Sequence, residues 1–364
     1  MKKGKALMRR IGMLTSGGDC QSLNATMRGV AKSLYKMFDD IEIVGFEDGY
    51  KGLMYADYRI MKQSDFSGIL DTRRYILGTS RQPFKLMRMP DENGLDKVEA
   101  MKHTYYKLKL ECLVILGGNG SQKTANLLRE EGLNIVSLPK TIDNDLWGSD
   151  LTFGFHSAVD VATNAIDCIH TTAASHGRVF IVEIMGHKVG WLALYAGIAG
   201  GADIILLPEI PYDIDVVVNA IRSRTKNGKN FTILAVAEAR FQGKCSLNQE
   251  RIKEEKNGPV YPSVAYELGA RFPSGRGRRS VWTVPGHMQR GGEPCPYDRV
   301  IATRLGAEAA EMIRRKEYGY MVALNNNKIE KIPLADIAGK LKMVDPKSDI
   351  IREAKDVGIS FGDE

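Results

Sequence analysis

The chain has 364 residues, which is too long for one small domain and suggests two. Hydrophobic residues make up 43% and charged residues 26%, as in soluble globular proteins, and no apolar run approaches the ~20 residues that span a bilayer. The net charge of +7 favours anionic partners, whereas the aromatic content of 8% argues against nucleic acid.

The compartment is expected to be the cytoplasm. The basic start of the chain is not followed by an apolar run long enough for a signal peptide. The five cysteines are scattered and form no Cys-x-x-Cys pair, which favours reduced thiols over disulfides or a zinc site.

The first two predicted elements flank a glycine turn. Residues 11–14 are predicted to form a strand and residues 23–38 a helix, with Ser16, Gly17, Gly18 and Asp19 between them. Backbone N–H groups of such a turn can bind phosphate oxygens beside a helix N-terminus. Turns of this kind are common in α/β proteins, so a purely structural turn is the alternative.

A second glycine turn follows a predicted strand over residues 113–116. Gly117, Gly118, Asn119, Gly120 and Ser121 lead into a predicted helix over residues 122–129, with Ser121 expected to cap its N-terminus. Because strand, glycines and cap agree, this is the stronger phosphate site. Between the two turns we expect a strand over residues 41–46 and a long surface loop over residues 82–96.

Two aspartates follow the apolar run 135–138, which is predicted to be a buried strand. Lys140 and Thr141 add a cation and a hydroxyl, and Asp143 and Asp145 are spaced i, i+2. At the end of a parallel strand, one carboxylate can accept a proton from a substrate while the other orients a metal. The alternative is a loop in which both aspartates cap turns.

The rest of the chain alternates strands and helices. We expect strands over residues 178–184, 203–207 and 231–236, helices over 188–200, 213–226 and 298–315, and a long helix ending near residue 176. A polar surface insertion is expected over 242–257. The predicted fold class is α/β, with two Rossmann-like domains, mainly parallel sheets and the active site in the cleft between them. The larger, nucleotide-binding domain is expected to span residues 1–154 and 289–340, and the smaller, sugar-phosphate-binding domain 155–288 and 341–364.

Five motifs in a fixed order resemble the 6-phosphofructokinase family. They are the turns at residues 15–19 and 116–121, the segment 139–145, the segment 183–186 and the segment 286–292. The resemblance runs from about Arg10 to about Leu324. It implies a glycolytic, allosteric kinase that transfers the γ-phosphoryl group of ATP to the 1-hydroxyl of fructose 6-phosphate with Mg²⁺.

The resemblance also implies a role for each site residue. Asp143 would be the general base, and Thr141, Gly18 and Arg81 would also be catalytic. The donor would be bound by Gly18, Arg81, Gly117, Gly118, Asn119, Gly120, Ser121 and Lys140. Fructose 6-phosphate would be bound by Thr141, Asp143, Asp145, Arg178, Met185, Gly186, Glu238, His287 and Arg290. Mg²⁺ would be bound by Asn119, Asp143 and Asp145.

The family supplies the arginine at position 178 from an adjacent chain. The resemblance therefore implies a homo-oligomer, either a tetramer or a dimer.

Three departures from the family pattern bear on these roles. Asn119 stands where the family usually has an aspartate, so magnesium would depend more on the donor phosphates, water and the two aspartates. Val281 stands where the family has a cross-subunit arginine, and either Arg278 or Arg279 could replace it. A family effector site is matched by Arg28, Asp203 and Lys229 but altered at His170 and Asn230, so it could be weakened or lost.

The phosphoryl donor has two interpretations. Gly120 leaves room for the α-phosphate of ATP, whereas Lys140 is typical of pyrophosphate-dependent members and also of one ATP-dependent branch. We expect ATP, with pyrophosphate as the alternative. A catalytically weak sugar-phosphate-binding subunit is a further alternative. Asn119 favours it, and the retention of Asp143, Asp145, Arg81 and Arg178 opposes it. A lipid or NAD kinase would share only the glycine loop and lacks the 286–292 motif.

Overall fold

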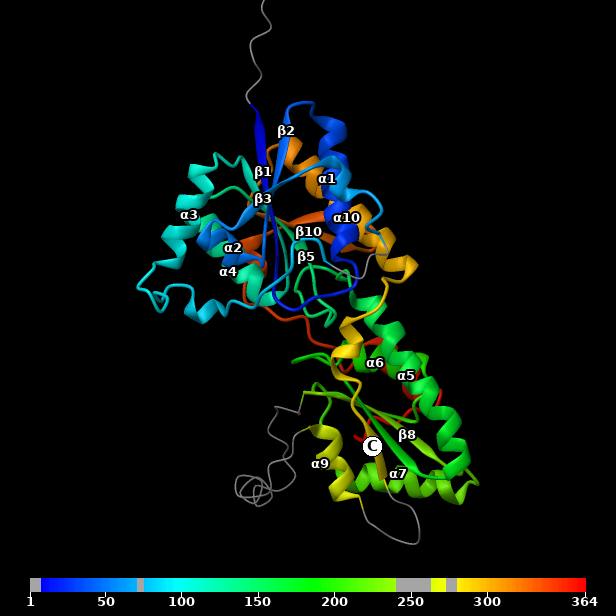
Figure 1. The fold of residues 1–364 in the computed structure, drawn as a ribbon. Helices are drawn as coiled ribbons and strands as arrows, with labels where there is room; N and C mark the ends of the chain where they lie inside the picture. Colours follow the sequence, from blue (N-terminus) through cyan, green and yellow to red (C-terminus); the bar gives the residue numbers. More distant parts are fainter. Residues whose placement is uncertain (1–7, 71–74, 240–262, 273–279) are drawn as a thin grey trace, which may run out of the picture. The chain divides into compact units, whose positions relative to one another are not determined.

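The computed structural model describes residues 8–70, 75–239, 263–272 and 280–364, which fall into two compact units (Figure 1). Unit 1 comprises Met1–Ser157 and Arg290–Lys342, and unit 2 comprises Ala158–Gln289 and Met343–Glu364. The predicted insertion over residues 242–257, like Arg278 and Arg279, lies outside the described residues. Among the described residues, no helix combines the length and apolarity needed to cross a membrane.

Unit 1 is built around a seven-stranded sheet in the order β11-β10-β5-β4-β1-β2-β3. Its strands are β1 (Arg9–Ser16), β2 (Ile41–Phe46), β3 (Tyr58–Met61), β4 (Cys112–Gly117), β5 (Ile135–Pro139), β10 (Tyr320–Asn325) and β11 (Lys328–Pro333). The five central strands are parallel, and the edge strands β3 and β11 pair antiparallel to their neighbours. Every residue of β4 and β5 is buried, as their continuous apolar runs predict for strands covered on both faces.

Helices cover both faces of this sheet (Figure 1). They are α1 (Leu23–Met37), α2 (Tyr50–Tyr55), α3 (Lys97–Lys107), α4 (Asn119–Glu130), α10 (Pro296–Arg314) and α11 (Leu334–Ile337), with 3-10 turns η1 (Gln63–Phe66) and η2 (Phe84–Leu86). Helices α1 and α10 approach closely because Gly29 faces Gly306, and a Cβ at Gly29 would lie 2.9 Å from the Thr303 carbonyl oxygen. The predicted loop over residues 82–96 contains η2 and is otherwise irregular.

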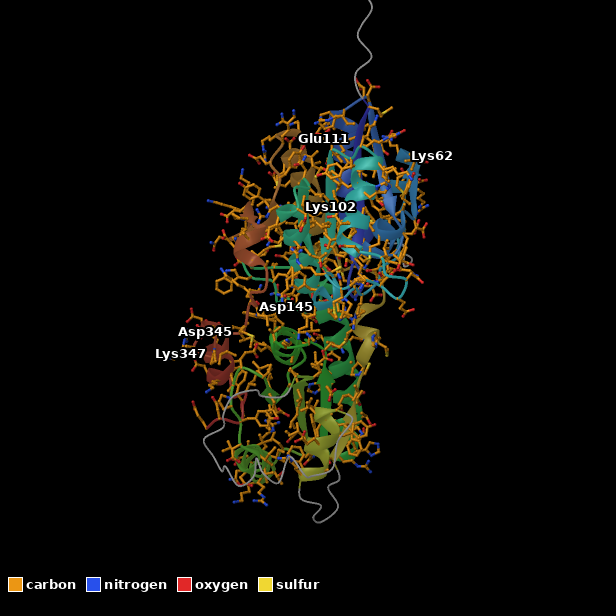
Figure 2. All side chains as sticks on the ribbon, turned by 90° about the vertical axis from the view of Figure 1, so that its left-hand side faces the viewer. Lys62, Lys102, Glu111, Asp145, Asp345 and Lys347 are labelled. Carbon is orange, nitrogen blue, oxygen red and sulfur yellow. The ribbon has the colours of Figure 1, made fainter. Side chains whose placement is uncertain are left out.

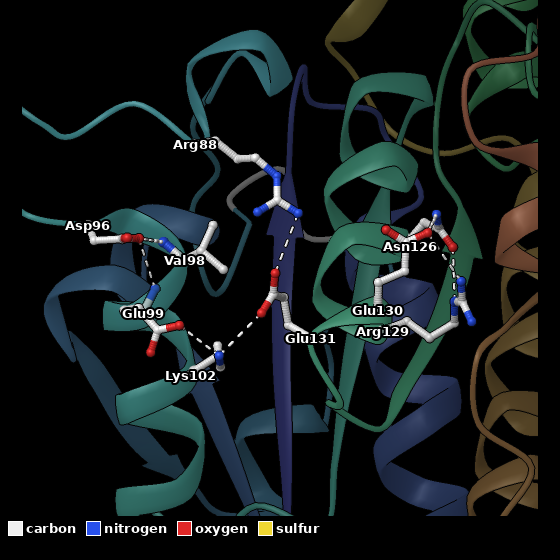
Figure 3. A network of polar contacts seen from close by, with 9 residues as sticks. All are labelled: Arg88, Asp96, Val98, Glu99, Lys102, Asn126, Arg129, Glu130 and Glu131. Atoms are coloured by element: carbon white, nitrogen blue, oxygen red, sulfur yellow. Dashed lines mark hydrogen bonds and ion pairs between the residues drawn. The ribbon is translucent and has the colours of Figure 1, made fainter.

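Ion pairs stabilise the periphery of unit 1. Glu111, labelled in Figure 2, precedes β4. It pairs with Arg9 at the start of β1, with Arg9 Nε 2.7 Å from Glu111 Oε2. On the helical surface, Lys102 bridges Glu99 at 2.7 Å and Glu131 at 3.2 Å (Figure 3). These exposed or half-exposed contacts are worth little individually, at most about 1 kcal/mol each.

Unit 2 is built around a four-stranded parallel sheet in the order β7-β8-β6-β9. Its elements are α5 (Phe155–His176, which begins in unit 1), β6 (Val179–Ile184), α6 (Trp191–Ala199), β7 (Ile204–Leu206), α7 (Ile214–Lys226), β8 (Thr232–Ala237), α9 (Val264–Arg271), β9 (Ser280–Thr283), η3 (Gly286–Arg290) and α12 (Asp349–Asp356). Its core joins apolar residues of β6, β7 and β8 to the inner faces of α7 and α9. The predicted fold class of two α/β domains with mainly parallel sheets is confirmed, with antiparallel pairing at both edges of the larger sheet.

Candidate active site

Three predicted motifs meet at one edge of the unit 1 sheet because of its strand order. Strands β5, β4 and β1 are adjacent and parallel, so the segments after Pro139, Gly117 and Ser16 leave the sheet side by side. Side-chain contacts join them: Ser121 Oγ donates to Ser16 Oγ at 3.0 Å. This edge is where open α/β sheets bind ligands.

The segment after β5 is shaped by Asn144, a residue that the sequence analysis left without a role. Asn144 adopts the left-handed conformation with φ of 54°. Its Oδ1 accepts the Thr152 N–H at 3.1 Å and its Nδ2 donates to the Asp150 carbonyl at 3.2 Å. Asparagine tolerates this conformation better than most residues. Asn144 therefore fixes the directions in which Asp143 and Asp145 leave the backbone.

Asp143 and Asp145 form a buried pair of carboxylates, with exposed fractions of 8% and 5%. Asp145 is labelled in Figure 2. Burial and the neighbouring Asp143 charge raise the pKa of Asp145, while Lys342 and Lys140 oppose this shift. The Asp143 N–H donates to Thr141 Oγ1 at 3.0 Å, which leaves the threonine hydroxyl proton for another acceptor. Burying two carboxylates side by side costs free energy unless a bound cation or a proton neutralises part of their charge.

The donor set of this edge suits magnesium. Asp145 Oδ1 is buried and has no hydrogen-bond partner among the described residues. Asn119 Nδ2 donates to the Lys340 carbonyl at 2.7 Å, so the amide nitrogen is committed and the amide oxygen is left for a ligand. Within the described ranges, no three His, Cys, Asp or Glu side chains cluster as a metal cage. Magnesium does not need one, because it uses one or two carboxylates together with water and substrate phosphates.

Two cations contact the glycine turn after β1. Lys140 Nζ donates to the Gly18 carbonyl, and Arg290 Nη1 donates to the Asp19 carbonyl at 3.0 Å. Burial lowers the pKa of Lys140 to about 8. Arg290 is also buried, and its Nε has no hydrogen-bond partner among the described residues. The turn thus carries two charges and a spare N–H donor beside Gly18, which suits an anion.

The turn after β4 differs from the sequence-based prediction in one respect. Helix α4 begins at Asn119 with Gly118 as its N-cap, so the prediction that Ser121 caps the helix was wrong. The Gln122 N–H already bonds to the Gly118 carbonyl at 2.9 Å, which places Ser121 inside the first turn. Gly117 has no room for a side chain, since its Cβ would clash with Ser121. Gly120, in contrast, is exposed, and nothing lies within 4 Å of a Cβ built there.

Arg81 follows a segment that is bonded to the first glycine turn. The Gly17 N–H donates to the Ser80 carbonyl at 3.0 Å, and Thr79 Oγ1 donates to the Gly17 carbonyl at 2.8 Å. The Arg81 side chain itself is exposed. Its position in the chain therefore places an exposed cation directly after the segment that is bonded to the turn.

Three of the residues predicted to bind the sugar, Met185, Gly186 and Glu238, lie in unit 2 at the carboxyl ends of β6 and β8. Glu238 Oε1 accepts the N–H groups of Gly186 at 3.1 Å and His187 at 2.6 Å. Gln289, which had no predicted role, accepts the Met185 N–H at 3.2 Å. His287 lies in the same 3-10 turn as Gln289 and is exposed.

Arg178 is not brought to this group within one chain. It precedes β6, whereas Met185 follows β6, so the length of the strand, roughly 20 Å at about 3.3 Å per residue, separates them. Its side chain is exposed. Val281 lies in β9, where it pairs with Phe180 of β6.

Two of the residues at the positions of the family effector site, Asp203 and His170, have contacts within unit 2. Asp203 pairs with Arg224 at 2.6 Å and accepts the Ile233 N–H at 2.9 Å. His170 Nε2 lies 2.7 Å from the Gly200 carbonyl. Lys229 and Asn230 follow α7 in unit 2, whereas Arg28 lies on α1 of unit 1.

Comparisons with known proteins agree with these motifs. The chain matches the phosphofructokinase family model over residues 10–313. It is 51% identical over 363 residues to an ATP-dependent 6-phosphofructokinase of Spirochaeta thermophila, covering 98% of each chain. It is 44% identical over 354 residues to ATP-dependent 6-phosphofructokinase 3 of Bacteroides thetaiotaomicron, covering 97% of this chain and all of that one.

Solved structures show the same fold. A phosphofructokinase structure from Saccharomyces cerevisiae matches with a TM-score of 0.74 and 29% identity over 90% of this chain, which spans 45% of that longer protein. The structure of Pichia pastoris phosphofructokinase in the T-state matches with a TM-score of 0.74 and 28% identity over 93% of this chain. This chain spans 36% of the Pichia pastoris chain. A pyrophosphate-dependent phosphofructokinase from Nitrosospira multiformis matches with a TM-score of 0.81 at 20% identity, which shows a similar fold only. The chain belongs to the phosphofructokinase family.

Proposed function

We propose that the protein is an ATP-dependent 6-phosphofructokinase, which transfers the γ-phosphoryl group of ATP to the 1-hydroxyl of fructose 6-phosphate in glycolysis. The observation that carries this proposal is the buried pair Asp143 and Asp145 at the sheet edge that also holds two glycine turns and two cations. The names of the relatives with 51% and 44% identity support both the donor and the acceptor.

Asp143 is the general base in this proposal. It accepts the proton of the 1-hydroxyl, and Thr141 donates its free hydroxyl proton to an oxygen of the acceptor or the transferred group. Phosphoryl transfer needs little covalent participation from the protein, so positioning and charge neutralisation supply most of the acceleration. Lys140, Arg81 and the backbone N–H groups near Gly18 neutralise the transferred group.

Asn119, Asp143 and Asp145 are the residues that would hold magnesium. When bound, the metal neutralises charge on the donor phosphates. The second glycine turn, Gly117 to Ser121, binds the donor at the N-terminus of α4, where backbone N–H groups and the helix dipole favour phosphate. The open space around Gly120 supports ATP over the smaller pyrophosphate.

The residues proposed for the sugar phosphate in unit 2 are Met185, Gly186, Glu238 and His287, and Arg290 is a further cation proposed for its phosphate group. Glu238 uses Oε1 for the backbone, so Oε2 is the atom proposed for sugar hydroxyls. Unit 1 is thus the proposed nucleotide-binding domain and unit 2 the sugar-phosphate-binding domain.

Arg178 is proposed to serve the sugar phosphate of an adjacent chain in a homo-oligomer, a tetramer or a dimer. The distance along β6 between Arg178 and Met185 supports this assignment. A cytoplasmic location is proposed from the glycolytic reaction. The cysteines of the described residues, Cys20, Cys112, Cys168 and Cys295, form no disulfide, which suits a reducing compartment.

Product identification tests the proposal. The protein is incubated with fructose 6-phosphate, ATP and magnesium, and the products are identified by ³¹P NMR. We expect a new phosphate ester at carbon 1 and ADP, and neither with Asp143→Asn over the same time. Hydrolysis of ATP to free phosphate without a second sugar ester would contradict the proposal.

A further inference from the structure

Gln289 is a buried polar residue that connects two segments of the sugar-phosphate domain. Its exposed fraction is 0%. Its Oε1 accepts the Met185 N–H at 3.2 Å, and its Nε2 donates to the Gly286 carbonyl at 3.2 Å. The turn after β6 and the 3-10 turn η3, about 100 residues apart in sequence, are therefore held together by one amide group.

The turn after β6 depends on such contacts. Three consecutive N–H groups, those of Met185, Gly186 and His187, donate to side-chain oxygens rather than to the backbone, the first to Gln289 and the other two to Glu238. His187 has φ of 54°, and a Cβ at Gly186 would clash with the Val189 carbonyl. The conformation is therefore maintained by these acceptors and not by regular secondary structure.

A residue needed only to fill this space would be apolar. Burying an amide is costly unless both of its ends are hydrogen-bonded, and a methionine would occupy nearly the same volume. The two bonds instead orient the amide, with its oxygen on the 185–187 turn and its nitrogen on η3. Met185 and Gly186 lie on one side of this link and His287 on the other.

We propose that Gln289 is a positioning residue for fructose 6-phosphate. It sets the position of the 185–187 turn relative to η3, and thereby the affinity for the sugar phosphate, without touching the ligand. This inference rests on the proposed function, because the two segments matter only if they bind the acceptor. It predicts that the affinity for the acceptor and the affinity for the donor respond separately to mutation.

Unit 1 contains a matched residue for comparison. Gln122 is 1% exposed, donates from Nε2 to the Gly117 carbonyl at 2.8 Å and accepts the Ser137 hydroxyl at 2.6 Å. It therefore holds the second glycine turn as Gln289 holds the 185–187 turn. Mutation of Gln122 is expected to weaken the donor site, with the acceptor site unaffected.

The experiment compares wild type with Gln289→Met, Gln289→Glu and Gln122→Met. Steady-state kinetics vary each substrate at saturating levels of the other, and calorimetry gives the Kd for fructose 6-phosphate. For Gln289→Met we expect KM and Kd for fructose 6-phosphate to rise about tenfold, equivalent to about 1.4 kcal/mol. Its KM for ATP should be unchanged and its kcat should change less than about threefold.

The two other variants show whether the hydrogen bonds are responsible. Gln289→Glu keeps an acceptor for the Met185 N–H, so its rise in Kd should be smaller than that of Gln289→Met. Gln122→Met should raise KM for ATP instead. An unchanged Kd for fructose 6-phosphate in Gln289→Met, or equal effects on both substrates, would overturn the inference.

Other outcomes are also decisive. If Gln289→Met does not fold, the Kd of Gln289→Glu for fructose 6-phosphate is the test. A Kd of Gln289→Glu identical to that of the wild type then overturns the inference. A wild type that binds fructose 6-phosphate but transfers no phosphoryl group overturns the proposed function alone, because the Kd values still test Gln289. A wild type that binds no fructose 6-phosphate overturns both.

Discussion

Replacing Gly120 by aspartate should separate stability from activity. Gly120 is the second residue of α4, is exposed, and has no atom within 4 Å of the position of a Cβ. The side chain therefore enters without a clash. Aspartate is a slightly better helix residue than glycine, and a carboxylate in the first turn gains about 0.3–1 kcal/mol from the helix dipole. We expect the stability to be unchanged or higher by up to about 1 kcal/mol.

The same carboxylate should oppose ATP. Two unit charges 4 Å apart interact with about 4 kcal/mol at an effective dielectric constant of 20, and counterions reduce this value. A loss of at least tenfold in kcat/KM for ATP, about 1.4 kcal/mol, is therefore a conservative expectation. The same carboxylate charge is therefore expected to stabilise helix α4 and to weaken the use of ATP.

A coupled assay of fructose 1,6-bisphosphate formation and a thermal unfolding curve measure the two effects. Gly120→Asn is the matched control, because it has the size of aspartate without its charge, and Gly120→Ala tests the Cβ alone. We expect a smaller loss in Gly120→Asn and little change in Gly120→Ala. Unchanged use of ATP by a folded Gly120→Asp would refute the placement of the donor beside Gly120.

Three further predictions concern the proposed general base, the shared site and Lys140. Asp143→Asn should lower kcat by at least the ~10²–10⁴ typical of a general base while fructose 6-phosphate still binds, and wild-type turnover would contradict the role. Mixed oligomers of Asp143→Asn and Arg178→Ala chains should recover part of the activity that each variant lacks alone, because some active sites then contain both intact residues. Verified mixed oligomers without activity would exclude a site shared between chains. KM for ATP should rise above about pH 8, since the lowered pKa of Lys140 means that its cation is lost as the pH rises through that value. Lys140→Arg keeps its charge and should remove this dependence, and the same pH profile in both proteins would exclude Lys140 as its source.

The parts of the site that depend on local pattern could be predicted from the sequence. The strands that contain the predicted apolar runs, β1, β4 and β5, end at Ser16, Gly117 and Pro139, and a glycine turn or Lys140 follows each. Periodicity predicted these strands, and the common site of the motifs after them was implied by the family resemblance. The strand order that places β5, β4 and β1 side by side is seen only in the structure.

Contacts between distant segments could not be predicted in this way. Arg290 reaches the Asp19 carbonyl across 271 positions, and Asn119 reaches the Lys340 carbonyl across 221. Such pairs depend on where α10 and the segment after α11 return to the sheet. The contact between Gln289 and Met185 could not be predicted either, since a glutamine in a polar motif is usually exposed.

The error at Ser121 has a local cause. Serine before an apolar-periodic run is a common N-cap, but Gly118 already provides the first carbonyl of the helix. Helix boundaries are set by backbone bonds that the side-chain pattern only partly reveals. Ser121 still lies at the site although it is not the N-cap, because its hydroxyl contacts Ser16.

A comparison of kcat/KM of the wild-type protein with ATP and with pyrophosphate tests whether ATP is the phosphoryl donor and fructose 6-phosphate the acceptor. Both reactions use saturating fructose 6-phosphate and magnesium, and fructose 1,6-bisphosphate is measured in each. We expect a kcat/KM for ATP that exceeds the value for pyrophosphate by at least about tenfold. Faster turnover with pyrophosphate would contradict it and would assign Lys140, rather than Gly120, as the residue that selects the donor.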